Sequence, residues 1–277
     1  MCRIIYNPCI AQLEMATKMS TIIYPSPIFG PIHSRRLGLS LGINLQPRDG
    51  KICTFDCIYC ECGFNKDFPP KSPRPSREAV AEALEQELRE MKARGTAPDV
   101  LTFAGNGEPT AHPQFAEIIN DTIRIRNDYF PSARISVLSN ATMTGHEKTR
   151  KALMLVDNNI LKLDTVNPSY ISLVDRPTNP SYDVRKIIEN MKSFHGHCIV
   201  QTMFMQGEAF GKSVDNTTTE YVAPWLEALK EIRPEKVMIY TIARETPIQG
   251  LRKAPRDILD SIKTKVEEAG ICCSASY

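Results

Sequence analysis

The sequence lacks the features that would mark a membrane protein, a secreted protein or a strongly charged binding protein. No apolar run approaches the roughly 20 residues that a membrane helix needs. The N-terminus has neither an apolar core nor a small-residue cleavage site, so we expect no secretory signal. The formal net charge is only +2, and no basic tail or aromatic stripe points to nucleic acid. We therefore expect a globular, cytoplasmic protein without a membrane partner.

A disulfide framework is missing as well, although cysteine itself is abundant. The chain has nine cysteines, an odd number, and four of them fall close together at positions 53, 57, 60 and 62. In a reducing compartment, clustered thiols serve more often as metal ligands or redox groups than as disulfide partners. Cys198, Cys272 and Cys273 have no ligand spacing, and we expect them to be buried structural residues.

No internal repeat or long low-complexity stretch divides the chain, and strand and helix patterns alternate along it. The expected strands are 39–45, 99–104, 134–138, 160–163, 198–205 and 236–242, and 271–274 has the pattern of a short final strand. The helical patterns between and after them are 80–91, 115–123, 147–155, 184–191, 222–232 and 258–266.

This alternation predicts the α/β class, with a partial (β/α)6 TIM-like barrel of parallel strands and right-handed crossovers. An open doubly wound sheet is the alternative. We divide the chain into a poorly patterned lead-in (1–24), a core barrel (25–250) and a C-terminal helix and strand packed on the core (251–277). In either architecture the functional loops follow the carboxyl ends of the strands.

The loop after the first expected strand carries the most specific motif. Cys53, Cys57 and Cys60 have the spacing C-x3-C-x2-C, so three thiolates can hold a cubane cluster and leave one iron without a protein ligand. By analogy with zinc sites, an open position is typical of catalytic metals. The alternative is a zinc site that uses Cys62 as a fourth ligand, although no second cysteine pair follows at the usual interval.

This motif, with the aromatic Tyr59 directly before the last cysteine, resembles the signature of the radical SAM (S-adenosylmethionine) superfamily. The resemblance implies a [4Fe-4S] cluster on the three cysteines, with SAM bound at the open iron. It also implies an external electron donor of the flavodoxin or ferredoxin type. In this family, reductive cleavage of SAM yields a 5′-deoxyadenosyl radical that abstracts hydrogen from a substrate.

Further motifs follow the later strands, and the resemblance assigns them to SAM. Residues 105–110, GNGEPT, are similar to the family's GGE motif, which implies SAM contacts for Asn106, Gly107, Glu108 and Pro109. Tyr59, Ser139, Asn140, Lys162, Asp164 and Tyr240 are further candidate SAM contacts. The residues alone leave alternatives open. Ser139 and Asn140 also suit a helix cap or an Asx-turn, and Lys162 and Asp164 also suit a mutual ion pair.

The segment from Gly30 to Leu45 resembles a subgroup near the wybutosine-forming enzymes, which modify tRNA. Arg35 and Arg36 are candidates for binding a carboxylate or a phosphate, and Arg176 is a candidate on the substrate side. The substrate itself, whether RNA, peptide or small molecule, does not follow from these residues. We expect Cys62 to lie near the cluster without binding it.

Overall fold

The computed structural model describes residues 21–34 and 37–277, and within them the expected parallel sheet is present. Its eight strands lie in the order β1-β2-β3-β4-β5-β6-β9-β11. Only β1 is antiparallel to its neighbour, and the other pairs are all parallel. The strands are β1 (Ile28–Ser34), β2 (Gly38–Ile43), β3 (Val100–Phe103), β4 (Arg134–Ser139), β5 (Asn158–Lys162), β6 (Ile199–Met203), β9 (Lys236–Tyr240) and β11 (Cys273–Ser276).

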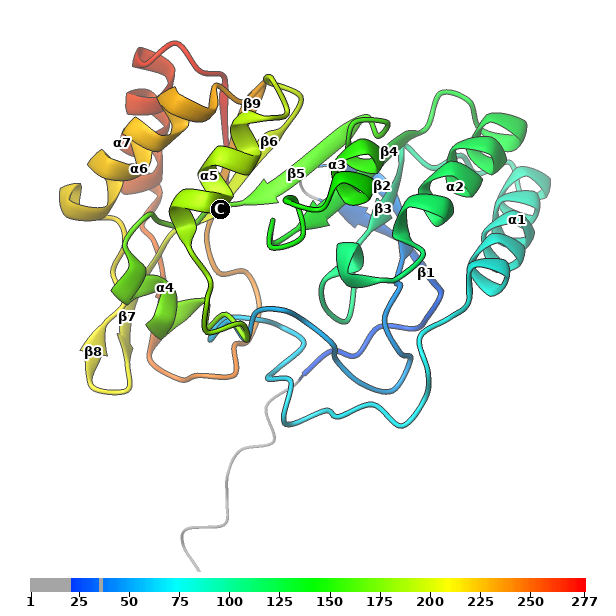
Figure 1. Ribbon diagram of the computed structural model, residues 1–277, viewed down its shortest axis with the longest axis horizontal. Helices are drawn as coiled ribbons and strands as arrows, with labels where there is room; N and C mark the ends of the chain where they lie inside the picture. The colour runs from blue at the N-terminus through cyan, green and yellow to red at the C-terminus, as the bar shows by residue number, and fades with distance from the viewer. Residues whose placement is uncertain (1–20, 35–36) are drawn as a thin grey trace, which may run out of the picture.

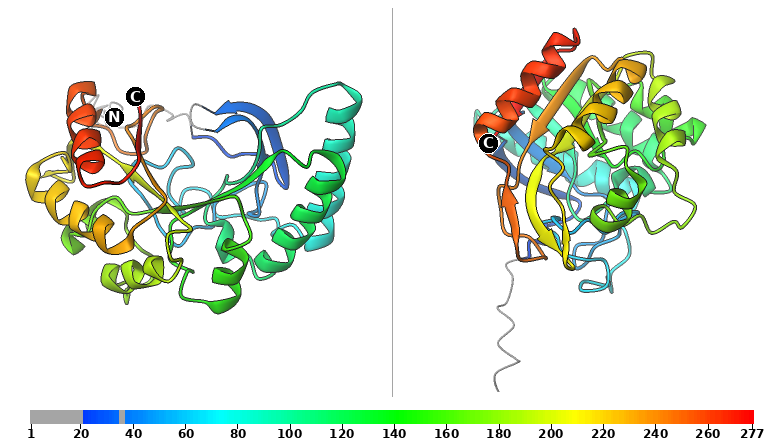
Figure 2. Two further views of the ribbon diagram at one scale, coloured as in Figure 1. Left: turned by 90° about the horizontal axis from the view of Figure 1, so that it is seen from above. Right: turned by 90° about the vertical axis from the view of Figure 1, so that its left-hand side faces the viewer.

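The helices connect these strands and lie outside the curled sheet. They are α1 (Arg77–Ala93), α2 (Phe115–Tyr129), α3 (Glu147–Leu153), α4 (Pro168–Val174), α5 (Val184–Lys192), α6 (Thr219–Ile232) and α7 (Arg256–Glu268), with a short 3₁₀ helix, η1 (Pro109–Ala111), before α2. Figure 1 shows α1, α2 and α3 on one side and α5, α6 and α7 on the other. Seen from above in Figure 2, the strands form an arc that stays open between β1 and β11. The fold is therefore the predicted partial barrel and not a doubly wound sheet.

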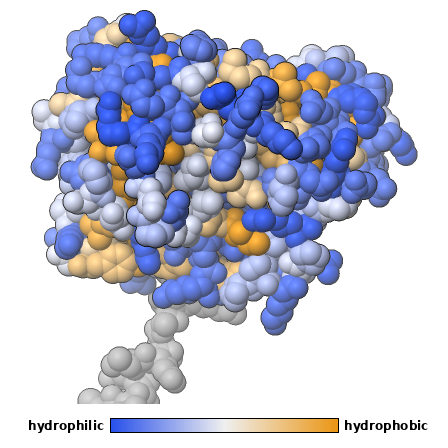
Figure 3. All heavy atoms as spheres, viewed as in Figure 1, coloured by the Kyte–Doolittle hydropathy of each residue, from blue (hydrophilic) through white to orange (hydrophobic). Residues whose placement is uncertain are grey.

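The main hydrophobic core lies between the outer face of the sheet and the helices. Helix α1 illustrates how the sequence builds it, because Ser76 caps the first turn by accepting a hydrogen bond from Ala79 N (3.2 Å). Its buried residues then recur at helical spacing, namely Val80, Leu84, Leu88 and Met91. The outer surface is mostly hydrophilic in the view of Figure 3. Among the described residues, none of the helices combines the length and apolar character that a membrane span requires.

A second, smaller sheet extends beyond the carboxyl end of β6, and the sequence patterns did not predict it. It contains β7 (Met205–Ala209), β8 (Lys212–Ser213) and β10 (Leu251–Lys253), in the order β10-β7-β8. Our predicted strand 198–205 is in fact β6 followed by the start of β7. A separate hydrophobic cluster packs this sheet and α4 against the cysteine loop, through residues such as Ile58, Val174 and Met205. The small sheet thus forms a wall beside the cysteines.

Candidate active site

The three predicted cluster ligands lie in the long loop between β2 and α1. Cys53, Cys57 and Cys60 are partly buried, whereas Cys62 is buried. Because the loop follows the first parallel strand, it lies at the edge of the sheet where the other functional loops also begin. This position brings the cysteines next to the segments that follow β3, β4 and β5.

The cysteine loop is attached to the segment after β3 by a short parallel bridge between Ile52 and Gly107. Ile52 N donates to Asn106 O (3.0 Å), and Glu108 N donates to Ile52 O (3.3 Å). Gly107 has a φ of +135°, and a Cβ atom there would lie 1.9 Å from Ile52 O. Only glycine permits this approach, so the GNGEP motif holds the cysteine loop in place.

The side chain of Asn65 joins the two ends of the cysteine loop. Its Oδ1 accepts from Cys53 N (3.1 Å), and its Nδ2 donates to Cys53 O (3.1 Å) and to Phe55 O (3.2 Å). Asn65 N in turn donates to Asp56 Oδ1 (2.7 Å). The sequence analysis missed this residue, because a single asparagine in a loop has no spacing pattern that would mark it.

The loop is also fixed from the side of α4. Asp56 N donates to Asp175 O (3.0 Å), and Ile58 N donates to Val174 O (2.9 Å), so the segment around Cys57 pairs with the end of that helix. The backbone between the cysteines is therefore held from two directions before any cofactor binds. Such preorganisation suits a site that must present several ligands in a fixed arrangement.

Electrostatics differ among the three thiols. Burial raises the pKa of Cys53 to about 12, and it raises that of Cys57 as well. A hydrogen bond from Cys62 lowers the pKa of Cys60 to about 6, and the nearby ammonium of Lys51 acts in the same direction. Lys162 and Lys51 both favour the thiolate forms that metal ligation requires.

The donor set fits an iron–sulfur cluster. Three soft thiolates from one preorganised loop are the usual ligands of such clusters. Within residues 21–34 and 37–277, no three His, Cys, Asp or Glu side chains converge on a position for a single metal ion.

Lys162 and Asp164 form an ion pair, one of the alternatives that the sequence left open. Lys162 Nζ contacts Asp164 and also Asp175 Oδ1 (2.5 Å), and all three groups are largely buried. The hydroxyl of Tyr59 donates to Asp164 Oδ2, and Lys162 Nζ lies 5.2 Å from the centre of the Tyr59 ring. Burial raises the pKa of Asp175 to about 7. These contacts fix Tyr59 between Cys57 and Cys60, two of the predicted cluster ligands.

Glu108 and Asn140 link the segments after β3 and β4 to the cysteines. Glu108 is 2% exposed, and its carboxylate accepts from Asn140 N (2.7 Å) and Thr110 N (3.0 Å). Burial raises its pKa. Asn140 Nδ2 donates to Thr54 Oγ1 (2.7 Å) and lies 3.7 Å from Cys53 Sγ.

Ser139 and Asn140 also accept local hydrogen bonds. Ser139 Oγ accepts from Ala141 N (3.0 Å), and Asn140 Oδ1 accepts from Thr142 N (3.1 Å). These are the turn contacts that the sequence offered as the alternative to SAM binding. Within the described structure, the side chains of both residues already serve the fold of this turn.

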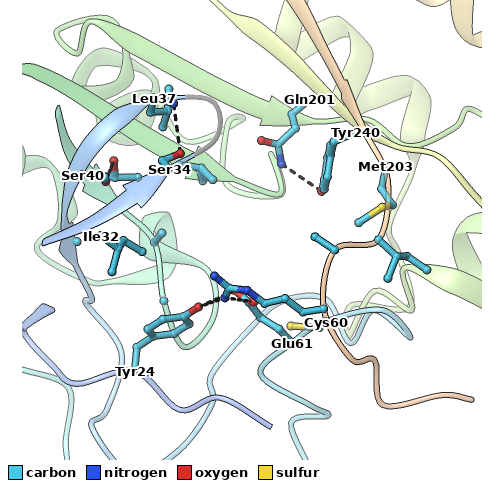
Figure 4. A pocket seen from close by; sticks show the side chains of 18 of the residues that line it. Tyr24, Ile32, Ser34, Leu37, Ser40, Cys60, Glu61, Gln201, Met203 and Tyr240 are labelled. Atoms are coloured by element: carbon cyan, nitrogen blue, oxygen red, sulfur yellow. Dashed lines mark hydrogen bonds and ion pairs between the residues drawn. The ribbon is translucent and has the colours of Figure 1, made fainter. Parts of the chain in front are cut away.

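A cavity of about 660 Å³ opens beside the cysteines, inside the curled sheet (Figure 4). The β1–β2 hairpin closes one side, and Gln201, Met203 and Tyr240 from β6 and β9 close the other. Gln201 Nε2 donates to the Tyr240 hydroxyl (3.3 Å). The cavity therefore has one predicted cluster ligand, Cys60, in its wall.

Three side chains meet at the rim of this cavity. The guanidinium of Arg244, on the segment after β9, contacts the carboxylate of Glu61 and the Tyr24 hydroxyl. Tyr24 OH also donates to Glu61 Oε1 (2.8 Å). The sequence analysis did not identify Arg244 or Glu61. The contacts join three distant parts of the chain next to Cys60.

The predicted SAM contacts divide into two groups. Tyr59 and Tyr240 line the cavity. The others surround or support the cysteine loop without lining that cavity, namely Asn106, Gly107, Glu108, Pro109, Ser139, Asn140, Lys162 and Asp164. Asn106, for example, is fully buried and donates to Tyr24 O (2.8 Å) and Pro47 O (3.0 Å).

The remaining arginine candidates lie apart from this cavity or outside the description. Arg176 stacks on Phe64, with its guanidinium 4.9 Å from the ring centre, and does not line the cavity. Arg35 and Arg36 lie outside the described residues.

A partial barrel with a three-cysteine loop at the carboxyl edge of its sheet defines a radical SAM enzyme. Residues 49–209, more than half of the chain, match the family model described as "Radical SAM superfamily", and the chain belongs to that superfamily. It is an enzyme with a [4Fe-4S] cluster and SAM as cofactors.

Among its relatives is a UPF0026 protein of Helicobacter pylori (strain J99), 28% identical over 251 residues, which cover 89% of this chain and 75% of that protein.

Solved structures show the same fold. Streptococcus suis SuiB bound to S-adenosylmethionine superimposes with a TM-score of 0.61 and 13% identity, over 85% of this chain and 50% of SuiB. TYW1 with a lysine-pyruvate adduct bound superimposes with a TM-score of 0.59 and 14% identity, over 83% of this chain and 73% of TYW1. The chain thus spans about half the length of SuiB. At these identities the likeness concerns the fold alone.

Proposed function

We propose that Cys53, Cys57 and Cys60 hold the [4Fe-4S] cluster and that SAM binds between the cysteine loop and Tyr240. When bound, these cofactors supply reductive cleavage of SAM to methionine and a 5′-deoxyadenosyl radical, which abstracts a hydrogen atom from the substrate. The electron comes from an external donor of the flavodoxin or ferredoxin type. The thiol chemistry suits a reducing compartment, and we place the reaction in the cytoplasm.

One observation carries this proposal. Three partly buried cysteines on one preorganised loop adjoin a cavity of about 660 Å³, and both Cys60 and Tyr59 line it. Binding pockets for small molecules occupy roughly 300–1,000 Å³, so this cavity is large enough for a cofactor together with part of a substrate.

We assign the chain's residues two kinds of role around that cavity. Tyr59 and Tyr240 contact SAM directly. The others orient the loops that bear the ligands or contact SAM through backbone atoms, namely Asn106, Gly107, Glu108, Pro109, Ser139, Asn140, Lys162 and Asp164. The supporting observations are the Gly107–Ile52 bridge and the hydrogen bond from Tyr59 to Asp164.

The substrate shares the cavity with SAM and enters past the rim formed by Tyr24, Glu61 and Arg244. A tRNA base is the alternative with most support, because the β1–β2 segment resembles the wybutosine subgroup and TYW1 has the same fold. A peptide or a small molecule would also fit a chamber of this size.

The decisive experiment is SAM cleavage by the anaerobically reconstituted chain. We expect about four irons per chain, and we expect 5′-deoxyadenosine to form only when dithionite is present. Cys57→Ala should lose the cluster and the cleavage together. Cys272→Ala is the matched control, because Cys272 is exposed and lies outside the loop, and it should keep both. Cleavage by the Cys57→Ala variant would refute the ligand assignment.

A further inference from the structure

An ion pair at the rim of the cavity connects the two segments between which we place SAM. Glu61 directly follows the predicted ligand Cys60, and Arg244 lies four residues after Tyr240, the last residue of β9. The guanidinium of Arg244 contacts the Glu61 carboxylate, and both side chains line the cavity. The pair therefore joins the cysteine loop to the segment that continues from Tyr240.

The Glu61 end of this pair is held by the surrounding chain. Glu61 O accepts from Ile22 N (3.0 Å), and Glu61 Oε1 accepts from Tyr24 OH (2.8 Å). Figure 4 shows the Tyr24 hydroxyl directed at the Glu61 side chain. Tyr24 is fixed in turn, because its N donates to Asn106 Oδ1 (2.8 Å) and its O accepts from Asn106 Nδ2 (2.8 Å). The carboxylate is thus presented from a fixed position.

The Arg244 end is anchored less closely. Residues 241–250 connect β9 to β10 and belong to neither strand. Ile242 is buried and Ile248 packs against the same small hydrophobic cluster, whereas residues 243–245 between them are exposed. Exposed segments with few packing contacts open most easily. The side chain of Arg244 ties this exposed stretch to the cysteine loop.

We propose that Arg244 and Glu61 are positioning residues for SAM, because their ion pair sets the separation between the cysteine loop and the segment after β9 before SAM binds. This inference rests on the SAM site proposed above. A ligand binds more tightly between segments that are already in place, since less order has to be created on binding. Exposed ion pairs contribute modestly, so we expect a local effect on SAM affinity and no loss of the cluster.

The test is the dissociation constant of SAM for the full-length, anaerobically reconstituted chain, measured by isothermal titration calorimetry without reductant. Arg244→Gln and Glu61→Gln should each weaken SAM binding about threefold at unchanged iron content. Arg244→Lys keeps the charge and should bind SAM nearly as tightly as the wild type. Glu231→Gln is the matched control, because Glu231 forms an exposed pair with Arg185 (2.9 Å) that does not line the cavity. Its SAM affinity should be unchanged.

The double variant separates positioning from direct contact with SAM. If the two residues act through their pair, Arg244→Gln combined with Glu61→Gln weakens binding no further than either substitution alone. Effects that multiply to about ninefold overturn the proposal, because each residue would then act on SAM independently. Tighter binding by Glu61→Gln also overturns it, since the released Arg244 would then bind the SAM carboxylate itself.

A second readout needs neither cofactor. Endoproteinase Glu-C cleaves after Glu245, which lies next to Arg244, and cleavage of a loop follows the population of its open form. In the cofactor-free full-length chain, Glu61→Gln should speed this cleavage about threefold, measured by mass spectrometry of the peptide that begins at Thr246. Glu231→Gln should leave the rate unchanged. Equal rates in the wild type and in Glu61→Gln would overturn the role of the pair.

The outcomes separate this inference from the proposed function. A wild-type chain that takes up no iron, or binds no SAM once reconstituted, overturns the proposed site and this inference together. If the wild type binds SAM, wild-type affinity in Arg244→Gln overturns the positioning role and leaves the proposed function standing. If Glu61→Gln takes up no iron, Arg244→Gln decides, because Arg244 lies outside the cysteine loop. Loss of iron from Arg244→Gln as well overturns the inference, since a residue that only positions SAM leaves the cluster in place.

Discussion

Cys62 lies two residues after Cys60, yet its surroundings differ from those of the three predicted ligands. It is 2% exposed, and its Sγ donates to the carbonyl of Gly105 (3.4 Å). The same thiol lies beside Cys60, and this contact lowers the pKa of the Cys60 thiol. A thiol that acts as a hydrogen-bond donor keeps its proton, whereas a metal ligand must lose it.

We therefore expect Cys62→Ala to keep the cluster. Iron and labile sulfide per chain should match the wild type, because the three ligand thiolates are unchanged. The measurement is iron and sulfide content after anaerobic reconstitution, with Cys57→Ala as the variant that should lose both. Loss of iron from Cys62→Ala would mean that its thiol is a ligand after all.

The turn between β3 and η1 is the element that fixes the cysteine loop, and Gly107 is its critical position. A side chain there would collide with Ile52 O and would have to adopt a φ of +135°. We expect Gly107→Ala to break the bridge, so that reconstituted protein retains much less iron and releases less than about one tenth of the wild-type 5′-deoxyadenosine.

Gly95→Ala is the matched control for that variant. Gly95 follows α1 with a φ of +69°, and a Cβ atom added there would meet nothing within 4 Å. This substitution should cost about 1 kcal/mol of unfolding free energy through backbone strain alone, without a change in iron content. Equal iron loss in both variants would show that general destabilisation, and not the bridge, is responsible.

The start of α2 carries a buried histidine whose two ring nitrogens have defined roles. His112 Nε2 donates to Pro75 O (3.0 Å), and its Nδ1 accepts from Gln114 N (3.1 Å). Burial lowers the pKa of His112 below its ordinary value of 6.5. The folded chain therefore favours the neutral ring, since a second proton would break the bond from Gln114.

This shift predicts acid sensitivity. Between the folded and unfolded pKa values the unfolded chain binds more protons, so stability falls as the pH drops below about 6.5. His112→Gln does not titrate and should therefore lose less unfolding free energy than the wild type between pH 7.5 and 5. Urea unfolding at both pH values measures this difference. Equal losses in the two chains would contradict the prediction.

The parallel strands, and the way they alternate with helices along the chain, were predictable because each strand is a short, buried apolar run. Several elements were not, among them β1, α4 and β10. β1 contains Gly30 and Pro31, which argue against a strand, and its pairing with β2 shifts register between Phe29 and Ile32. Helix α4 has only seven residues, and β10 pairs with β7 across more than 40 positions. Periodicity reports burial, not pairing partners, so such long-range contacts stay hidden.

The same distinction applies to the candidate site. Cys53, Cys57, Cys60 and Tyr59 form a motif with fixed spacing, and a motif can be read from one sequence. Lys51, Asn65 and Arg244 act through contacts with distant or irregular parts of the chain, and their residue types are common in loops. Their roles depend on where the loop folds, which no local pattern records.

At the scale of the whole molecule, the two largest hydrophobic clusters of the described residues have different tasks. The larger joins the sheet to the outer helices and includes Leu84. The smaller joins the cysteine loop to α4 and the small sheet, and Ile58, between Cys57 and Tyr59, is fully buried in it. Loss of packing in the larger cluster should therefore destabilise the barrel, and loss of packing in the smaller cluster should disturb the cofactor site.

This separation can be tested with two truncations of similar chemistry. Ile58→Ala and Leu84→Ala both delete fully buried methyl groups, and each should cost about 2–5 kcal/mol locally. Leu84→Ala should lower the global unfolding free energy, measured in urea, while each folded chain still binds its iron. Ile58→Ala should lose iron under conditions in which circular dichroism shows that the barrel remains folded. The reason is that the space left by the deleted methyl groups lies within the cysteine loop itself. If the two variants lose iron and global stability in the same proportion, the two clusters act as one cooperative core, and the cysteine loop has no independent support.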